Sequence, residues 1–559
     1  MSAVRFDKLS KAFGGRAALK GLSASIAAGR LTGLVGPDGA GKTTLLRLMA
    51  GLLAPSSGVL EVAGREPLAA ADLATVVGYM PQRFGLYEDL SVIENLNLYA
   101  DLKSLPPQSR QADIAKLLSF TQLAPFTARL AGKLSGGMKQ KLGLACALMG
   151  SPKVLLLDEP GVGVDPVSRQ ELWRMVKALT DDGMAVLWAT AYLDEAERCE
   201  DVLLLSEGEL IFQGPPARLT GRLEGRCVRL SKTGEDKRQL LVRALAMPAV
   251  RDGVIEGEAL RLVLAEGQTA EALSDLGGTL SPVAPRFEDA FVDLLGRGPG
   301  GHSALADTFS PLPRQEAPVV QCEHLCRRFG DFVATADSTF AVRQGEIFGL
   351  LGPNGAGKST TFKMLCGLLK PSAGTARVLG IDLARAPSAA KSQLGYMAQK
   401  FSLYGLLSVA QNLHFSAGVY GLAGKAAAKR IDEMVDCFSL APLLGSAPDA
   451  LSLGFKQRLA LACALMHSPP ILFLDEPTSG VDPLTRREFW THINGLVRKG
   501  VTVLVTTHFM DEAEYCDRVA LMHRGNIIAL GSPDQLRQQA GSDSMEAAFI
   551  KLIEEAEAC

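Results

Sequence analysis

The chain has 559 residues, of which 47% are hydrophobic and 21% are charged, and its formal net charge is −2. That length exceeds what one hydrophobic core usually serves, and the near-neutral charge excludes a bulk attraction to nucleic acid or to an anionic membrane surface. No apolar run approaches the roughly 18 residues of a membrane span, and the N-terminus lacks a signal-peptide core, so we expect a soluble, intracellular protein of two domains.

The first segment that carries chemistry is 36–44, GPDGAGKTT, which follows the apolar run Leu31–Val35. Its glycines let successive backbone N–H groups turn toward one point, and the positive end of the next helix adds to them, which is typical of a phosphate-binding loop. Lys42 would reach the β- and γ-phosphates of a nucleotide, and Thr43 would ligate Mg²⁺. The candidate residues are Gly36, Pro37, Asp38, Gly39, Ala40, Gly41, Lys42, Thr43 and Thr44.

Two acids follow a later strand-like run, VLLL at 154–157. Asp158 and Glu159 would therefore lie at the carboxyl end of a buried strand, where open α/β sheets bind ligands. Downstream of a phosphate loop, the first acid of such a pair holds Mg²⁺ and the second orients or deprotonates the attacking water. Short apolar strands alternate with helical stretches over 1–221, which predicts an α/β domain with a mostly parallel sheet.

The second half of the chain repeats the first. Gln82, Ser135 and Asp158 recur as Gln399, Ser452 and Asp475, each 317 positions later. We infer a duplicated domain. An ordinary glycine-rich turn is the alternative for each loop, but all fixed positions of the motif are filled. The second candidate site consists of Gly352, Pro353, Asn354, Gly355, Ala356, Gly357, Lys358, Ser359 and Thr360, together with Asp475 as a metal ligand and Glu476.

Three ordered motifs carry a family resemblance. LSGGMKQ at 134–140, LLLDEP and GVGVDP, repeated later as LSLGFKQ, FLDEP and SGVDP, resemble the ATP-binding-cassette (ABC) family over about four-fifths of the chain. The resemblance implies a phosphate-loop core with a helical subdomain in each cassette. It also implies head-to-tail pairing, with ATP between the phosphate loop of one cassette and the signature of the other.

The resemblance assigns roles to further residues. The signature contacts to the γ-phosphate fall on Ser135, Gly136, Gly137, Ser452 and Gly454. The family's switch histidine falls on His508, and further contacts to the metal and nucleotide fall on Gln82 and Gln399. Phe13 and Phe329 match the aromatic residue that stacks on adenine, with core packing as the alternative.

The two halves differ in length and in boundaries. FEDAFVDLL at 287–295 resembles MEAAFIKLI at 545–553, but the spacing is 258, so the first half carries about 59 extra residues. Strand-like segments there predict a small α/β accessory domain. We expect a first cassette at 1–221, the accessory insertion with a C-terminal helix at 222–295, a flexible Gly- and Pro-rich linker at 296–318, a second cassette at 319–540 and a C-terminal helix at 541–559.

The halves also differ in chemistry. His508 has Ala191 as its counterpart, and alanine cannot donate to a phosphate. Leu453 stands where the first signature has Gly136, whose missing side chain permits close approach of the backbone. With head-to-tail pairing, Ala191 and Leu453 fall in the same composite site, the one built on Lys42. We therefore predict one hydrolytic site, with Glu476 and His508 as catalytic groups, and one degenerate site with Glu159.

We interpret the chain as the ATPase subunit of an ABC transporter that uses ATP and Mg²⁺. Its cassettes most resemble those of ABC-2 type exporters of the drug-resistance or polysaccharide and lipid class. We expect separate transmembrane permease subunits as partners, no direct binding of nucleic acid, and a peripheral location at the cytoplasmic face of the inner membrane. A twin-cassette translation factor acting on the ribosome and a non-hydrolysing ATP sensor are the alternatives.

The segments RFGLYEDLSVIENL and KFSLYGLLSVAQNL carry the resemblance to exporters. Apolar and aromatic residues recur there at matched positions, and they predict a groove that docks to the membrane subunits. Core packing is the alternative, because exposed and buried aromatic residues cannot be told apart by type alone. The residues are Phe84, Leu86, Tyr87, Phe401, Leu403 and Tyr404.

Overall fold

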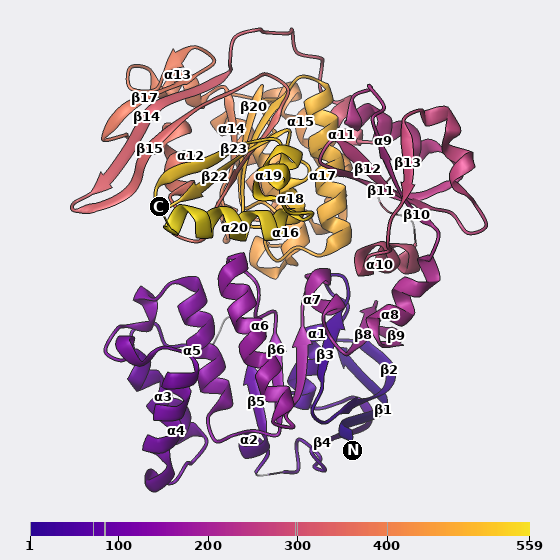
Figure 1. Ribbon diagram of the computed structural model, residues 1–559, viewed down its shortest axis with the longest axis vertical. Coiled ribbons are helices and arrows are strands. Elements are labelled where there is room, and N and C mark those ends of the chain that lie inside the picture. The colour runs from indigo at the N-terminus through magenta and orange to yellow at the C-terminus, as the bar shows by residue number, and fades with distance from the viewer. Residues whose placement is uncertain are drawn as a thin grey trace. The chain divides into compact units, whose positions relative to one another are not determined.

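The computed structural model describes residues 2–70, 72–82, 85–296, 298, 300–399 and 401–558. The chain divides into two compact units (Figure 1). The first unit consists of Met1–Leu223 and Pro285–Leu295, and the second of Glu224–Ala284 and Gly296–Cys559. Each unit contains one copy of the duplicated domain, which we call the first and the second cassette.

The first cassette is built around a six-stranded sheet with the strand order β5-β6-β7-β3-β8-β9. Every residue of β3, β6 and β7 is buried, as is usual for parallel strands covered by helices on both faces. All neighbours pair in parallel except β8 and β9, so the expected parallel α/β sheet is confirmed. The strands are β3 (Leu31–Val35), β5 (Val77–Met80), β6 (Val154–Asp158), β7 (Ala185–Ala189), β8 (Asp201–Ser206) and β9 (Glu209–Gly214).

A second sheet of the first cassette is antiparallel, with the order β2-β1-β4. It comprises β1 (Ser2–Phe13), β2 (Arg16–Ala27) and β4 (Ser57–Val62). Val4 and Phe6 of β1 share one hydrophobic core with Leu34 and Leu156 of the parallel sheet. The helices of this unit are α1 (Lys42–Met49), α2 (Leu73–Val76), α3 (Val92–Leu102), α4 (Pro107–Phe120), α5 (Gly136–Leu148), α6 (Pro166–Asp181), α7 (Leu193–Glu197), α8 (Pro216–Thr220) and α10 (Phe287–Leu295).

The second cassette repeats this plan in a ten-stranded sheet, with the order β18-β17-β14-β15-β23-β22-β16-β21-β20-β19. Its strands are β14 (Val320–Phe329), β15 (Phe332–Val342), β16 (Ile347–Leu351), β17 (Ala373–Val378), β18 (Ile381–Asp382), β19 (Leu394–Met397), β20 (Ile471–Asp475), β21 (Thr502–Thr507), β22 (Arg518–His523) and β23 (Asn526–Gly531). Its helices are α12 (Lys358–Leu365), α13 (Pro387–Lys391), α14 (Val409–Val419), α15 (Gly424–Cys437), α16 (Leu453–Ala464), α17 (Pro483–Arg498), α18 (Met510–Ala513), α19 (Pro533–Ala540) and α20 (Met545–Ala558).

The helical subdomain of each cassette starts at the same local signal. Ser91 caps α3 in a capping box with Glu94, and Ser408 caps α14 in a capping box with Gln411. In both boxes the serine hydroxyl accepts from the backbone N–H three residues later, while the longer side chain accepts from the serine backbone N–H. The sequence therefore fixes where these helices begin, independently of their packing.

The accessory domain is a four-stranded antiparallel sheet with the order β11-β12-β10-β13 and one helix, α9. Its elements are β10 (Cys227–Ser231), α9 (Lys237–Ala246), β11 (Val250–Glu256), β12 (Ala259–Leu264) and β13 (Thr279–Pro282). Leu240 of α9 is buried against the sheet together with Leu230, Ile255 and Leu262. The expectation of a small α/β domain agrees with these elements.

The segment 222–295, which the sequence groups as one accessory part, is divided between the two units. Residues 224–284 belong with the second cassette, whereas α10 contacts α7 and α8 of the first. Phe287 and Phe291 of α10 are fully buried, and this burial explains why the helix stays with the first cassette.

The sequence also predicts a flexible linker over 296–318, and for residues 303–312 this prediction is wrong. Helix α11 (Ala304–Asp307) places Leu305 in the core of the second unit, and Phe309 follows it there under the Arg430 guanidinium, 5.0 Å from the ring centroid. The Ser303 Oγ atom lies 3.0 Å from His492 Nδ1. Burial of these apolar side chains offsets the entropy of ordering a Gly- and Pro-rich segment.

Within the part of the chain that the structure describes, no helix is both long enough and apolar enough to cross a bilayer.

Candidate nucleotide-binding sites

The phosphate loop of the second cassette lies between β16 and α12, and close packing fixes its backbone. A side chain at Gly352 would meet the carbonyl oxygen of Met522 at 2.3 Å. One at Gly357 would meet that of Ala334 at 2.4 Å, and Gly357 also has a φ of 103° at the N-cap of α12. Only glycine fits both positions, and the loop ends at a helix N-terminus, which favours a bound phosphate.

The lysine of each loop is buried and folds back over the loop. Lys358 Nζ donates to the carbonyl oxygens of Gly352 at 2.7 Å and Pro353 at 3.1 Å. Lys42 makes the equivalent pair of hydrogen bonds at 2.7 and 3.2 Å. The ammonium group of each lysine thus lies against its own loop. The other predicted residues lie in the loops, at 36–41 and 352–357, and in the first turns of α1 and α12, at 43–44 and 359–360.

Two of the three residues predicted to hold Mg²⁺ come together in each cassette, whereas the third, Gln82 or Gln399, donates to the glutamate that follows the aspartate. Thr43 Oγ1 donates to Asp158 Oδ1 at 3.1 Å, and Ser359 Oγ donates to Asp475 Oδ1 at 3.2 Å. A hydroxyl oxygen and a carboxylate oxygen side by side, facing a phosphate loop, are the kind of donors that Mg²⁺ prefers. The residues present therefore fit the metal.

The acid that follows each of these aspartates has an unusual backbone. Glu159 has a φ of 52° and Glu476 a φ of 48°, values that L-residues rarely adopt. The backbone N–H of each acid donates to a carbonyl oxygen of the neighbouring strand. Glu159 donates to Ala189 at 2.9 Å, and Glu476 donates to Thr506 at 3.0 Å. Such strain costs of order 1–3 kcal/mol and persists where the surrounding structure imposes it, which is common at functional sites.

Glu476 lies among groups that favour its charged form. Gln399 Nε2 donates to its Oε2 atom at 2.7 Å, and His508 Nδ1 lies 3.3 Å from the same oxygen. Burial acts to raise the pKa of Glu476, but the neighbouring His508 and Lys358, together with the hydrogen bond from Gln399, outweigh it and lower the pKa below its ordinary value. At neutral pH this side chain is a carboxylate and can accept a proton from water.

Glu159 lies in a comparable place with a different electrostatic result. Gln82 donates to it, as Gln399 does to Glu476, but Ala191 takes the place of the histidine. Burial raises the pKa of Glu159 to about 7, although Lys42 acts against this shift. Near neutral pH a substantial fraction of Glu159 is therefore protonated and unable to act as a base.

The sequence reasoning missed a second difference beside these acids. In the second cassette, the Thr506 hydroxyl donates to Asp475 Oδ1 at 2.5 Å and accepts from the Glu476 N–H at 3.0 Å. The corresponding residue of the first cassette is Ala189, whose side chain can do neither. This difference is visible in the aligned repeats, where 506–508 is TTH and 189–191 is ATA, but the sequence analysis used only the histidine.

The signature segments open two equivalent helices with different local detail. Ser135 is exposed and caps α5 by accepting from the Met138 N–H at 3.3 Å, whereas Ser452 begins α16 without a cap bond from its side chain. Leu453 is half-buried next to Ser452. How the signatures meet the opposite phosphate loops stays a prediction, as do the roles of Gly136, Gly137 and Gly454.

Several aromatic residues singled out in the sequence are exposed. Phe13 and Phe329 expose 49% and 47% of their surface, so core packing does not explain them, and stacking on adenine stays a prediction. Tyr87 and Tyr404 expose 57% and 51%, whereas Phe401 and Leu403 are partly buried against the core. Phe84 lies outside the described residues.

Both cassettes thus join a glycine loop, a buried lysine and a strand-end acid pair on a parallel sheet, and this combination defines a tandem phosphate-loop ATPase. A family model described as "ABC transporter" matches residues 19–162 and 335–479. The chain belongs to the ABC transporter family, and it is an ATP-binding ABC ATPase with two nucleotide-binding domains.

Relatives extend over different shares of the chain. "Probable multidrug ABC transporter ATP-binding protein YbhF" from Escherichia coli (strain K12) is 57% identical over 98% of this chain and 97% of that protein. "Linearmycin resistance ATP-binding protein LnrL" from Bacillus subtilis (strain 168) is 35% identical over 43% of this chain and 77% of that protein. A solved "Structure of ATP binding subunit of ABC transporter" is 32% identical, covering 42% of this chain and 99% of that one, with a TM-score of 0.40.

Proposed function

We propose that the chain is the ATP-hydrolysing subunit of an exporter and that hydrolysis takes place at Glu476, while the site built on Lys42 mainly retains ATP. The observation that carries this proposal is the contrast between the two acids. Glu476 lies 3.3 Å from His508 Nδ1, and the Thr506 hydroxyl contacts both Asp475 and the Glu476 N–H, whereas the first cassette has Ala191 and Ala189 at these two positions. The lowered pKa of Glu476 and the pKa of about 7 for Glu159 agree with this contrast.

The residues of the second site divide the work of hydrolysis. Lys358 would neutralise charge on the β- and γ-phosphates, and Mg²⁺ held by Ser359 and Asp475 would supply further neutralisation there. Glu476, as a carboxylate, would orient a water molecule and accept its proton. Thr506 fixes both acids, because its hydroxyl contacts the side chain of Asp475 and the backbone of Glu476. His508 holds Glu476 in its charged form and would contact the γ-phosphate.

The first site keeps the groups that bind but lacks those that activate water. Lys42, Thr43 and Asp158 have the same arrangement as their counterparts in the second site. Ala189 and Ala191 stand where the second cassette has Thr506 and His508, whose hydroxyl and imidazole contact Glu476. ATP bound there would act as a largely unhydrolysed clamp between the cassettes.

The exporter assignment is supported by the names of relatives, which include a probable multidrug transporter protein and a linearmycin resistance protein. A "Nod factor export ATP-binding protein I" from Burkholderia lata is also similar, at 39% identity over 39% of this chain. These names favour transport over a role on the ribosome. We propose that separate transmembrane subunits bind this chain and that it works at the membrane as a peripheral subunit.

Membrane association is expected to depend on the two exposed tyrosines at matched positions in the cassettes. Tyr87→Glu with Tyr404→Glu should move the chain from the membrane fraction to the supernatant while ATP still binds, because a charge on a docking surface must be desolvated. Cell fractionation by centrifugation, followed by nucleotide binding on the purified chain, measures both.

The matched control substitutes two other exposed, repeat-related residues, Leu52→Glu with Leu368→Glu, whose side chains are 61% and 51% exposed. This variant should remain with membranes. Association of the tyrosine variant at the level of the unsubstituted chain would remove the docking surface from the proposal, and co-sedimentation of the unsubstituted chain with ribosomes would overturn the transporter assignment.

A further inference from the structure

In each cassette, an acid holds the start of the strand that leads into the phosphate loop. In the first, Glu200 Oε2 accepts from the Leu31 N–H at 2.8 Å, and the Glu200 N–H donates to the Leu31 carbonyl at 3.1 Å. In the second, Asp517 exchanges the same two hydrogen bonds with Ile347, each at 2.8 Å. Since β3 and β16 run directly into their loops, this acid anchors the strand that leads into each phosphate loop.

In the first cassette, the cation that neutralises this acid comes from the cassette itself. Lys177 on α6 forms an ion pair and a hydrogen bond with Glu200. The corresponding residue on α17 of the second cassette is Asn494, which carries no charge. The second cassette therefore lacks the lysine with which the first one completes this site.

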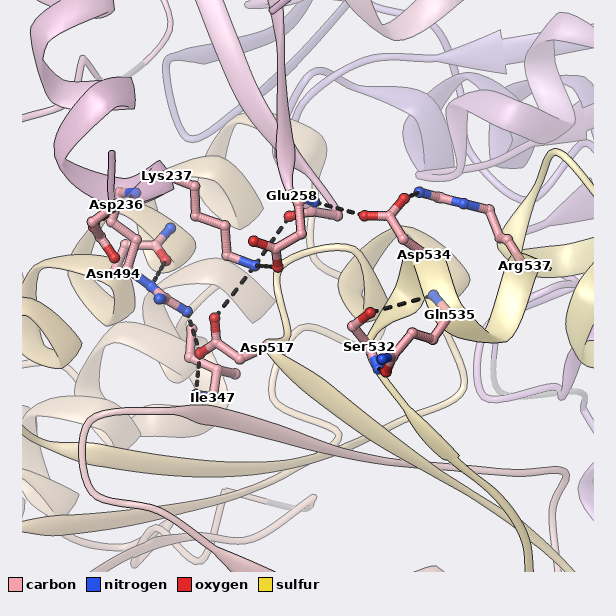
Figure 2. A network of polar contacts seen from close by, with 12 residues as sticks. Asp236, Lys237, Glu258, Ile347, Asn494, Asp517, Ser532, Asp534, Gln535 and Arg537 are labelled. Carbon is pink, nitrogen blue, oxygen red and sulfur yellow. Dashed lines mark hydrogen bonds and ion pairs between the residues drawn. The ribbon is translucent and has the colours of Figure 1, made fainter. Parts of the chain in front are cut away.

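The accessory domain supplies the missing charge. Arg238 of α9 donates to Asp517 Oδ2 at 2.7 Å and, through its Nε atom, to Asn494 Oδ1 at 3.1 Å. Lys237 Nζ lies 3.3 Å from the other carboxylate oxygen of Asp517. Figure 2 shows the Asp517 carboxylate between the Lys237 nitrogen above it and Ile347 below it, with a dashed line to each. In the second cassette, two cations of the accessory domain thus take the place that Lys177 of α6 has in the first cassette.

The two cations of these contacts are buried, so their loss has consequences. Lys237 and Arg238 expose only 6% and 5% of their surface. Burial acts to raise the pKa of Asp517, but Arg238 and Lys237 outweigh it and lower the pKa. Without Arg238, Asp517 keeps only Lys237 as a cation, and losing one partner of a largely buried ion pair is more damaging than losing an exposed pair.

A second set of contacts holds the accessory domain against the second cassette. At the β11–β12 turn, the Gly257 N–H donates to the Glu514 carbonyl at 3.3 Å, and the Glu258 N–H donates to Asp534 Oδ2 at 2.9 Å (Figure 2). A side chain at Gly257 would meet that aspartate oxygen at 2.6 Å. The turn is therefore closely fitted to the second cassette, and α9 is held where its cations reach Asp517.

We propose that the accessory domain is a built-in positioning element of the second nucleotide site. Its Arg238 and Lys237 substitute for the lysine that position 494 lacks, and through Asp517 they hold the strand that presents the phosphate loop. Both are positioning residues, since they act on the nucleotide only through Asp517 and β16. The inference requires that the second cassette binds ATP, and it does not depend on which site hydrolyses.

The test measures nucleotide binding by the second loop alone, in the full chain carrying Lys42→Ala. Arg238→Met is expected to weaken binding of a fluorescent ATP analogue about tenfold, which corresponds to ~1.4 kcal/mol. Adding Asn494→Lys, which rebuilds the arrangement of the first cassette, should restore binding to within about threefold of the parent. A merely structural role for Arg238 would not be rescued by a new lysine on a different helix.

Arg243→Met is the matched control, because Arg243 lies on the same helix but pairs with Glu235 within the accessory domain. It should bind like the parent. If Arg238→Met does not fold, the double variant with Asn494→Lys decides, and it should fold and bind. Normal binding by Arg238→Met, or a folded double variant that binds no better than Arg238→Met alone, overturns the proposal. Equal ATPase losses in Glu159 and Glu476 variants would instead refute only the assignment of the hydrolytic site.

Discussion

Glu476→Gln is expected to reduce the steady-state ATPase rate by about 10² to 10³, whereas Glu159→Gln is expected to cost far less. Glutamine keeps the size of the side chain but cannot accept a proton from water. In the second site this removes a charged base, whereas in the first it changes a group whose pKa is already about 7. The comparison requires the two variants side by side in otherwise unaltered chains, at saturating ATP.

ATP binding provides the control for this pair, because neither substitution changes the phosphate loops. Both variants should bind ATP with unchanged stoichiometry. Equal losses of activity would show that the two sites fire in obligate alternation, and the contrast between the acids would then have no bearing on catalysis.

His508→Ala is expected to lower the rate and also to shift its dependence on pH. The imidazole lies 3.3 Å from Glu476 and helps to lower the pKa of that acid. Without it, burial dominates and the pKa of Glu476 rises, as it does for Glu159 next to Ala191, where it is about 7. A base must be deprotonated to act, so activity is lost as pH falls through its pKa, and the acid limb of the profile should move up toward pH 7.

The measurement is kcat from about pH 5.5, where Glu476 with its lowered pKa is still charged, to about pH 9, well above a pKa of about 7. The loss in His508→Ala should be larger at the acid end than at the alkaline end. His324→Ala is the control, since His324 is exposed and pairs only with Asp337 among the described residues. A uniform loss at every pH would mean that His508 acts on the phosphate alone and not through Glu476.

Much of the fold could be predicted from the sequence because its signals are local. Apolar runs such as Leu31–Val35 appear as buried strands. The phosphate loops and the strand-end acids were found because their chemistry requires fixed residue types at fixed spacing. These are properties of short segments, and short segments can be read without the rest of the chain.

What the sequence did not reveal depends on contacts between distant segments. Nothing in GRGPGGHSALADTF indicates that Leu305 and Phe309 enter the core of the second unit, since composition reports backbone stiffness and not burial. Likewise, Arg238 and Asp517 are 279 positions apart, and each alone reads as an ordinary surface charge. The role of Thr506 was missed for a different reason. Threonine is common in β-strands, so its presence in a buried strand does not by itself indicate a functional hydroxyl.

The chain passes between its two units near residues 223, 284 and 295, so the repeats visible in the sequence are not the modules that fold. A break at Gly301 would leave the accessory domain on the N-terminal fragment, although its partner surface, with Asp517, Asn494 and Arg487, lies on the C-terminal one. Two such fragments should therefore complement each other and co-purify as a complex without any covalent tether. Expressed alone, the C-terminal fragment would lack the cations for Asp517 and expose a surface that is buried in the intact chain. We expect it to be unstable until the other fragment is added, as thermal unfolding of each fragment and of the mixture would show.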